Sequence, residues 1–204
     1  MKKLIVISIL VISGLLIAAL SYVFIRSNAI IYKTYNVPLV DVVIPHDAVS
    51  MAAGKKIALT RGCFGCHNDK LSGNVFLDWE VGMIAVNISK KILQYSDKEL
   101  FRLFRHGIKK DGTGLWSMPA GMFINLSQKY IYRLIAYLRT IPAVEDTLPN
   151  TAFSFNGRLK IISGELLSEV TMARQAVKKF HYPDNPTLIQ QGNYLVLLLT
   201  CIVD

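Results

Sequence analysis

Apolar residues are concentrated in one long run near the N-terminus. The 22 residues from Leu4 to Ile25 carry no charge. As a helix they reach about 33 Å, enough to cross the hydrocarbon core of a bilayer. We therefore expect residues 1–26 to form an uncleaved transmembrane signal-anchor. A cleaved signal peptide is the alternative, because Ala19-Leu20-Ser21 resembles a small-x-small cleavage site.

The charges beside this run predict its orientation. Lys2 and Lys3 precede it and Arg26 closes it, which favours an N-terminus inside and the rest of the chain outside. Both alternatives export residues 27–204. In a bacterium the chain would then be a single-pass protein of the inner (cytoplasmic) membrane, facing the oxidising periplasm.

Beyond the anchor, the pattern predicts short helices separated by long loops. Residues 27–50, interrupted by two prolines, are expected to be a linker. Residues 51–61 predict a helix, with Ser50 available as its N-cap and Gly62 as its terminator. Residues 68–95 are expected to be a loop region.

Two amphipathic helices follow. Ser96 and Glu99 form a capping-box pattern, followed by apolar residues on one face at Leu100, Leu103, Phe104 and Ile108. Ser127 opens the next helix, which Pro142 ends; its apolar positions are Ile131, Leu134, Ile135 and Leu138. Residues 51–142 thus combine short helices with long loops, an arrangement acceptable in a compact domain if something large fills its centre.

Composition narrows the class of protein. Of 204 residues, 52% are hydrophobic and 18% charged, which argues against a disordered chain, and three cysteines are too few for a disulfide scaffold. The formal net charge is +9, or +7 without Lys2 and Lys3 (21 basic minus 14 acidic residues). A basic balance favours acidic partners or a membrane surface; nucleic acid is not expected as a partner of an exported chain.

The sequence Cys63-Phe64-Gly65-Cys66-His67 is a C-x-x-C-H motif. This motif attaches c-type haem: two thiols one helical turn apart add to the two vinyl groups, and the histidine that follows binds the iron. We expect one covalently bound haem c. The alternatives are a zinc site, which would need a second ligand pair, and a redox dithiol, which would need a βαβ context.

The second axial ligand is expected to be Met118, which precedes Pro119 in a loop bounded by glycines. A thioether is a soft ligand that favours ferrous iron and raises the reduction potential. Met122, Met83 and His106 are the alternatives. With His67 and Met118 both bound, no coordination position stays open, so we expect an electron carrier and not an enzyme.

Three aromatic residues are candidates for the wall of the haem pocket, and ordinary core packing explains them equally well: Tyr95, Trp116 and Phe123.

Together these motifs make residues 51–142 resemble the class I cytochromes c. More narrowly they resemble the membrane-anchored, multi-haem cytochrome c subunits of bacterial alcohol and gluconate dehydrogenases. Besides Cys63-x-x-Cys66-His67 and Met118-Pro119, the resemblance is carried by Asn87-Ile88-Ser89, Tyr95-Ser96-Asp97-x-Glu99-Leu100, Gly107-x-x-x-Asp111-Gly112 and Tyr137-Leu138-Arg139-x-Ile141-Pro142. It implies an all-α cytochrome c fold whose N-terminal and C-terminal helices cross, with Gly54 at a close contact against Tyr137 or a neighbour.

The C-terminal part contains the trace of a repeat. The interval from Gly54 to Cys63 aligns without gaps to that from Gly192 to Cys201, but Ile202-Val203-Asp204 follows instead of a second haem motif. The expectation is that residues 143–204 are an inter-domain segment and the truncated start of a second cytochrome c domain. A chance apolar helix with a lone cysteine is the alternative. Within the segment, Glu165 to Lys179 predicts a helix with Leu166, Val170 and Ala173 on one side.

The functional hypothesis is a membrane-anchored periplasmic cytochrome that carries single electrons between redox partner proteins, either dehydrogenases or oxidases. Its alternatives are a cytochrome subunit of a periplasmic alcohol or sugar-acid dehydrogenase, a truncated non-functional di-haem cytochrome, and a ligand-sensing haem module with a displaceable Met118. The basic clusters Lys90-Lys91, Lys109-Lys110 and Lys178-Lys179 could steer an acidic partner, or form a solvated face.

Overall fold

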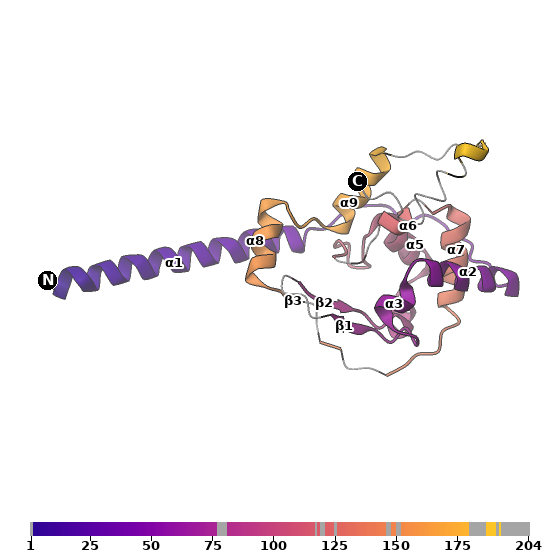
Figure 1. Cartoon of the computed structure of the whole chain (residues 1–204), viewed down its shortest axis with the longest axis horizontal. Coiled ribbons are helices and arrows are strands. Elements are labelled where there is room, and N and C mark those ends of the chain that lie inside the picture. The colour runs from indigo at the N-terminus through magenta and orange to yellow at the C-terminus, as the bar shows by residue number, and fades with distance from the viewer. Residues whose placement is uncertain are drawn as a thin grey trace.

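The computed structural model describes residues 2–76, 81–116, 118, 121–124, 126–145, 148–149, 152–179, 187–190 and 192. Helix α1 (Lys2–Ile31) projects from a helical body as a long arm (Figure 1). Its most apolar stretch has a mean hydropathy of 2.8, with no buried residue. The predicted N-terminal helix is therefore confirmed as long and apolar enough to cross a membrane, and it extends five residues beyond the expected boundary.

The body is mostly helical, as expected. Its longer helices are α2 (Ala48–Thr60), α5 (Asp97–His106), α7 (Gln128–Leu138), α8 (Phe155–Ser163) and α9 (Glu169–Lys179). Short helices connect them: α3 (Cys63–His67), α4 (Ile88–Lys91), the 3₁₀ turn η1 (Ile92–Gln94) and α6 (Gly121–Ile124).

Helix α2 begins earlier than its sequence suggested. Asp47 is the N-cap, and its carboxylate accepts a hydrogen bond of 2.8 Å from the Ser50 backbone N–H. Ser50 was expected to be the cap but lies buried in the first turn, because a carboxylate three residues upstream satisfies the same orphan donors. The predicted end is confirmed: Gly62 takes a left-handed conformation with φ of 72° directly after Arg61.

The expected crossing of the N-terminal and C-terminal helices is present between α2 and α7. A Cβ atom built on Gly54 would lie 2.0 Å from the Arg133 carbonyl oxygen and 2.7 Å from Tyr137 Cβ. The two backbones can therefore approach only because residue 54 has no side chain.

Helices α5 and α7 have the predicted caps and buried faces. Ser96 and Glu99 form the complete capping box, and Ser127 accepts from the Tyr130 N–H. Six of the eight apolar positions predicted for these two helices belong to the buried core cluster, together with Ala58, Cys63, Leu71, Ile92, Phe101 and Phe123. Leu103 is partly buried against the cluster. Ile108 is buried but lies beyond α5, which ends at His106 because Gly107 takes a left-handed conformation. The hydrophobic period of 3.6 residues therefore identified the helix faces that pack together.

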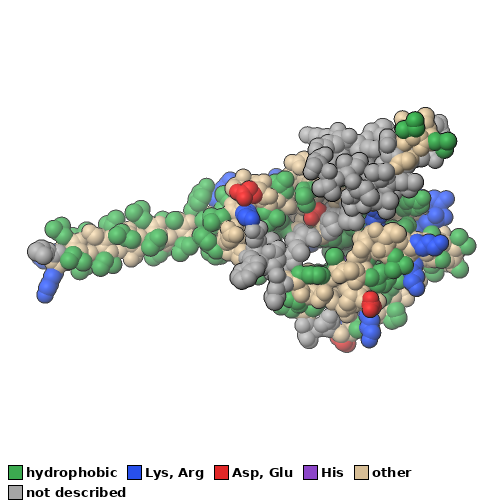
Figure 2. Space-filling view, in the orientation of Figure 1, with side chains coloured by type: hydrophobic (Ala, Val, Ile, Leu, Met, Phe, Trp, Pro, Cys, Tyr) green, Lys and Arg blue, Asp and Glu red, His purple; other side chains and the backbone are tan. Residues whose placement is uncertain are grey.

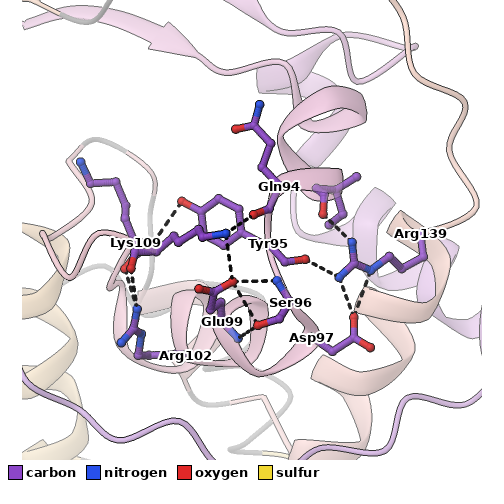
Figure 3. Close-up of polar contacts among 10 residues, drawn as sticks. Gln94, Tyr95, Ser96, Asp97, Glu99, Arg102, Lys109 and Arg139 are labelled. Carbon is purple, nitrogen blue, oxygen red and sulfur yellow. Dashed lines mark hydrogen bonds and ion pairs between the residues drawn. The ribbon is translucent and has the colours of Figure 1, made fainter.

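One side chain joins the C-terminal end of α7 to the start of α5 (Figure 3). Arg139 donates from Nε and Nη2 to Asp97 Oδ1, at 3.0 and 2.7 Å, and from Nη2 to the Tyr95 carbonyl oxygen at 2.7 Å. Its Nη1 donates to the Ile92 carbonyl oxygen. The guanidinium thus holds η1, the cap of α5 and the end of α7 together.

A small antiparallel sheet was not expected. Strands β1 (Asn74–Phe76), β2 (Val81–Ala85) and β3 (Ala152–Phe153) pair in that order, with Val75 opposite Ile84 and Gly82 opposite Ala152. The expectation of a loop throughout residues 68–95 was therefore wrong. Strands this short carry almost no alternating pattern, and the pairing with β3 depends on residues far along the chain.

Segments on both sides of residues 51–142 pack against the body. The Tyr35 N–H donates to the Gly112 carbonyl oxygen at 2.9 Å, and Ile44, 6% exposed, belongs to the core. Helix α8 lies on α1, and α9 lies on α5 and α6. The helix expected from Glu165 begins instead at Glu169, with Val170 and Ala173 buried. Residues 193–204, which include Cys201, lie outside the described residues.

Candidate functional site

The two motif cysteines lie in α3, a helix of little more than one turn. Gly62 precedes it with positive φ, and the Cys66 N–H donates to the Gly62 carbonyl oxygen at 3.2 Å. Both cysteines are free thiols; Cys63 is buried in the core and Cys66 is exposed. A spacing of three residues on one helical turn places both sulfurs on the same side of α3, which is the arrangement that two neighbouring vinyl groups require.

The two thiols differ in their surroundings. Burial raises the pKa of the Cys63 thiol to about 11, because an apolar environment disfavours the thiolate. Cys63 is therefore protonated at neutral pH in the haem-free chain and packs as part of the apolar core.

The ring of His67 is buried, with 8% exposed. Its Nδ1 lies 2.7 Å from the Val86 carbonyl oxygen. A carbonyl oxygen only accepts, so Nδ1 carries the hydrogen and Nε2 keeps its lone pair. Burial lowers the pKa of His67, and the hydrogen bond to Val86 opposes this only in part. The ring is thus held neutral and in the tautomer that binds a metal through Nε2.

The Val86 carbonyl is itself held in place by its neighbours. Asn87 Nδ2 donates to the Val144 carbonyl oxygen at 2.8 Å, and the fully buried Ser89 donates to Asn87 Oδ1 at 2.6 Å. The Val144 N–H donates in turn to Ser89 Oγ at 3.0 Å. These bonds tie the segment that orients His67 to the chain after α7.

The loop after His67 is closed by Asn68. Its Nδ2 donates to Ser72 Oγ and to the Gly73 carbonyl oxygen, both at 2.8 Å, while Oδ1 accepts from the Lys70 N–H at 2.9 Å. The Gly73 N–H donates to the His67 carbonyl oxygen at 3.0 Å. This compact loop fixes the direction of the chain directly after the histidine.

Met118 is half-buried and packs against the core cluster that contains Cys63, Phe104 and Phe123. Pro119 and the side chains of Met83 and Met122 lie outside the described residues. Met118 is therefore in contact with the core that encloses Cys63, and its role as a ligand stays a prediction.

His106 lies half-buried in the last turn of α5. Burial lowers its pKa, and the positive charges of Arg105, Arg102 and Arg174 lower it further. Three guanidinium groups are poor surroundings for a second metal ligand of an already cationic centre, and nothing in the described structure favours His106 over Met118.

The three aromatic candidates have different positions. Phe123 is 2% exposed and lies 5.4 Å, centroid to centroid, from Phe104 in the core. Tyr95 is partly buried and packs against the same core. Trp116 packs edge-on against Phe153 at 5.4 Å, and its Nε1 donates to the Ile31 carbonyl oxygen at 3.4 Å. Trp116 thus contacts the end of α1.

Sequence reasoning missed the Val86 carbonyl and the closure by Asn68. A backbone carbonyl leaves no signal in the residue type at its position. For Asn68 the available signal was an asparagine followed shortly by serine and glycine, a combination typical of side-chain-bonded turns.

The donor set fits a covalently attached haem. Two free thiols one turn apart, an imidazole presenting Nε2 and a thioether on the same core are the groups that c-type attachment and His/Met ligation require. Within the parts of the chain that the structure describes, no group of three or more His, Cys, Asp or Glu side chains could hold a metal ion by itself. The zinc alternative thus gains no support from these residues.

The cytochrome c family model matches residues 51–142 of this chain, a little under half of its 204 residues. No curated protein matches the chain. The matched range contains α3, the α2–α7 crossing and Met118.

Proposed function

Residues 51–142 form a cytochrome c domain, which implies electron transfer by a bound haem, and on this premise we propose that the chain is a membrane-anchored periplasmic carrier of single electrons. The observation that carries the proposal is the pairing of two free thiols in α3 with a His67 ring whose Nδ1 is bound to Val86. When bound, haem supplies reversible one-electron chemistry at its iron.

The roles of the individual residues follow from their chemistry. Cys63 and Cys66 would form the two thioether bonds, and His67 Nε2 would bind the iron on one face. Met118 would bind it on the other face, where a thioether favours the reduced state and raises the potential. The apolar core formed by α2, α5 and α7 adjoins Cys63 and Met118 and would help to keep water away from the iron, so that little solvent has to reorganise when the charge changes.

The anchor is proposed from α1. Its residues 2–22 are all exposed although most are apolar, and Figure 2 shows hydrophobic side chains along the projecting arm. Lys2 and Lys3 support an orientation with its start on the cytoplasmic side. A tethered carrier works at a high effective concentration beside membrane-bound dehydrogenases and oxidases.

The lysine clusters give little support for steering a partner. Lys90 pairs with Glu145, Lys109 lies 3.9 Å from Asp111, and Lys110 lies 3.8 Å from Glu99. Of the four lysines in residues 51–142 that could attract an acidic partner, three therefore have acidic neighbours that reduce the positive potential around them. The partner remains proposed as a dehydrogenase or an oxidase in general.

A haem count tests the proposal. The full-length chain is produced with working c-type maturation machinery, purified in detergent, and analysed by pyridine haemochrome. We expect one covalent haem per chain, and none in a Cys63→Ala, Cys66→Ala double variant. A colourless wild-type protein would refute the proposal, and two haems per chain would refute the single centre.

Carbon monoxide distinguishes the carrier from a ligand-sensing haem module. Tight ligation by His67 and Met118 leaves the reduced protein unreactive toward the gas. Rapid binding by the wild-type protein would favour the sensor. Co-purification with a catalytic subunit from native membranes would instead favour the dehydrogenase-subunit alternative.

A further inference from the structure

The part of α1 that precedes its first buried residue is about as long as a membrane span. Residues 2–22 are exposed, and Val23, 9% exposed, is the first buried residue of the described chain. The twenty residues from Leu4 to Val23 extend about 30 Å as a helix, which is the thickness of the hydrocarbon core. Protein contacts with α1 therefore begin where the hydrocarbon ends.

The element at this point is α8. Arg158 Nη1 donates to Ser27 Oγ at 2.7 Å and to Asn28 Oδ1 at 2.8 Å. The same guanidinium lies over the ring of Phe24, 4.6 Å from its centroid. These contacts fix α8 at a defined depth along α1. In Figure 1, α8 runs across α1 and not along it.

The surface of α8 is divided into two apolar sides. Ile161 is 3% exposed and Gly157 is buried. Phe155 and Leu159, four residues apart, are 46% and 42% exposed. Ile162 follows three residues later and is half-buried, so these three residues form one stripe along the helix. We call Phe155, Leu159 and Ile162 the outer stripe of α8.

We propose that α8 is an interfacial helix whose outer stripe lies in the phospholipid bilayer, at the boundary between acyl chains and headgroups. The proposal rests on the proposed membrane anchor. An exposed apolar stripe on a helix that is bonded to α1, at the depth where the hydrocarbon ends, lies within reach of the bilayer.

The arrangement would fix the orientation of the cytochrome domain. An anchor alone leaves the domain free to rotate and tilt on its tether. A second helix lying in the membrane plane, and bonded to α1 through Arg158, restricts that motion. The face that the domain presents to a membrane-bound partner is then selected by α8.

Spin-label accessibility tests the proposal on the full-length, haem-loaded chain in nanodiscs of phosphatidylethanolamine and phosphatidylglycerol. In a Cys201→Ser background, labels are placed by Leu159→Cys and Phe155→Cys on the outer stripe. Val49→Cys on α2, a site 73% exposed and remote from α1, is the aqueous control. Ile12→Cys, in the middle of the exposed part of α1, is the hydrocarbon control. Collision rates are measured with oxygen, which partitions into lipid, and with a water-soluble nickel chelate.

We expect an oxygen-to-nickel collision ratio at 159 and 155 that is several-fold higher than at 49 and lower than at 12. An aqueous ratio at both stripe positions, with position 12 in hydrocarbon, overturns the interfacial helix and leaves the anchor intact. Exclusion of both reagents at 159 and 155 overturns it in favour of a protein covering the stripe. An aqueous ratio at position 12 overturns the anchor and the interfacial helix together.

Discussion

At the scale of single residues, the chemistry of the site depends on a backbone carbonyl. The Val86 oxygen, 2.7 Å from His67 Nδ1, selects the tautomer that leaves Nε2 available. The hydrogen bonds among Asn87, Ser89 and Val144 hold that carbonyl in turn. The proposed iron ligand His67 thus owes its orientation to groups outside the C-x-x-C-H motif.

Replacement of the proposed second ligand tests the site. Met118→Ala should leave the covalent haem count unchanged, lower the reduction potential and abolish the sulfur-to-iron charge-transfer absorption in the red, because the iron loses its thioether. Absorption spectroscopy and a redox titration measure these effects. Met172→Ala, at an exposed position on α9, is the matched control and should change neither. A band that survives in Met118→Ala would assign the ligand to another methionine.

Residue 54 is sensitive to a single methyl group. Gly54→Ala places a Cβ 2.0 Å from the Arg133 carbonyl oxygen, so α2 and α7 must separate, and we expect a loss of about 1–3 kcal/mol or more in the free energy of unfolding. Denaturant unfolding of the haem-loaded protein measures it. Ala52→Leu, on the exposed side of the same helix, should stay within about 0.5 kcal/mol. Equal stability of Gly54→Ala and wild type would contradict the close crossing.

At the scale of elements, many of the side-chain hydrogen bonds lie at the ends of helices. The capping box of α5 and the Arg139 contacts converge within a few residues (Figure 3). These bonds explain two of the segments in which the chain resembles the cytochromes c, around Tyr95-Ser96-Asp97 and around Arg139. Both segments hold α5 against α7 beside the core cluster that contains Cys63.

Glu99, in the first turn of α5, makes the free energy of unfolding depend on pH. Partial burial raises the pKa of Glu99, but hydrogen bonds from Ser96 and the charges of Lys110 and Arg102 together hold that pKa below its ordinary value of about 4.3. Its stabilising effect is therefore full above that ordinary pKa and is lost as pH falls through the lower folded-state pKa. Glu99→Gln should cost about 0.3–1 kcal/mol at pH 7.

The difference in unfolding free energy between Glu99→Gln and wild type should shrink as the pH falls below the ordinary pKa of glutamate. Thermal unfolding at a series of pH values measures it. Glu145→Gln, at a side chain 91% exposed, is the control. A difference that stays constant down to acid pH would show that the charge of Glu99 contributes nothing at this terminus.

Arg139 stabilises mainly by satisfying carbonyl oxygens. Asp97 is 40% exposed, so solvent screens its ion pair, whereas the carbonyls of Ile92 and Tyr95 depend on the planar guanidinium. We expect Arg139→Lys to cost about 1–3 kcal/mol of unfolding free energy and Asp97→Asn less than about 1 kcal/mol. Denaturant unfolding compares them. A larger loss of unfolding free energy in Asp97→Asn than in Arg139→Lys would show that the ion pair, and not the carbonyl contacts, gives most of the stabilisation.

At the scale of the whole molecule, the cytochrome domain is joined to α1, its proposed anchor, by segments that precede and follow the domain in sequence. Residues 32–47 run back along the body and place Ile44 in the core. Helix α8, which follows the domain in sequence, packs on α1, which precedes it. Anchor and domain are therefore connected through side-chain contacts as well as through the chain.

Arg158 makes the most specific of these contacts. Arg158→Ala removes the hydrogen bonds to Ser27 and Asn28 and the contact with Phe24. We expect amide hydrogen exchange in α8 to rise at least several-fold in nanodiscs, with the haem spectrum unchanged. Asn156→Ala, at an exposed position on the same helix, should leave the exchange near wild type. Unchanged protection of α8 in Arg158→Ala would show that the two helices are held by apolar packing alone.

The sequence by itself determined the long apolar N-terminal helix, the helix faces, the caps at Ser96 and Ser127, and the C-x-x-C-H motif, because each of these depends on residues within a few positions of one another. Only the tertiary structure decided what depends on distant partners: the pairing of β2 with β3 in the small sheet, the hydrogen bond from His67 to the Val86 carbonyl, and the packing of α8 on α1. A local pattern records the environment that a segment needs, whereas a backbone hydrogen bond or a helix crossing at Gly54 becomes specified only when the rest of the chain is folded around it.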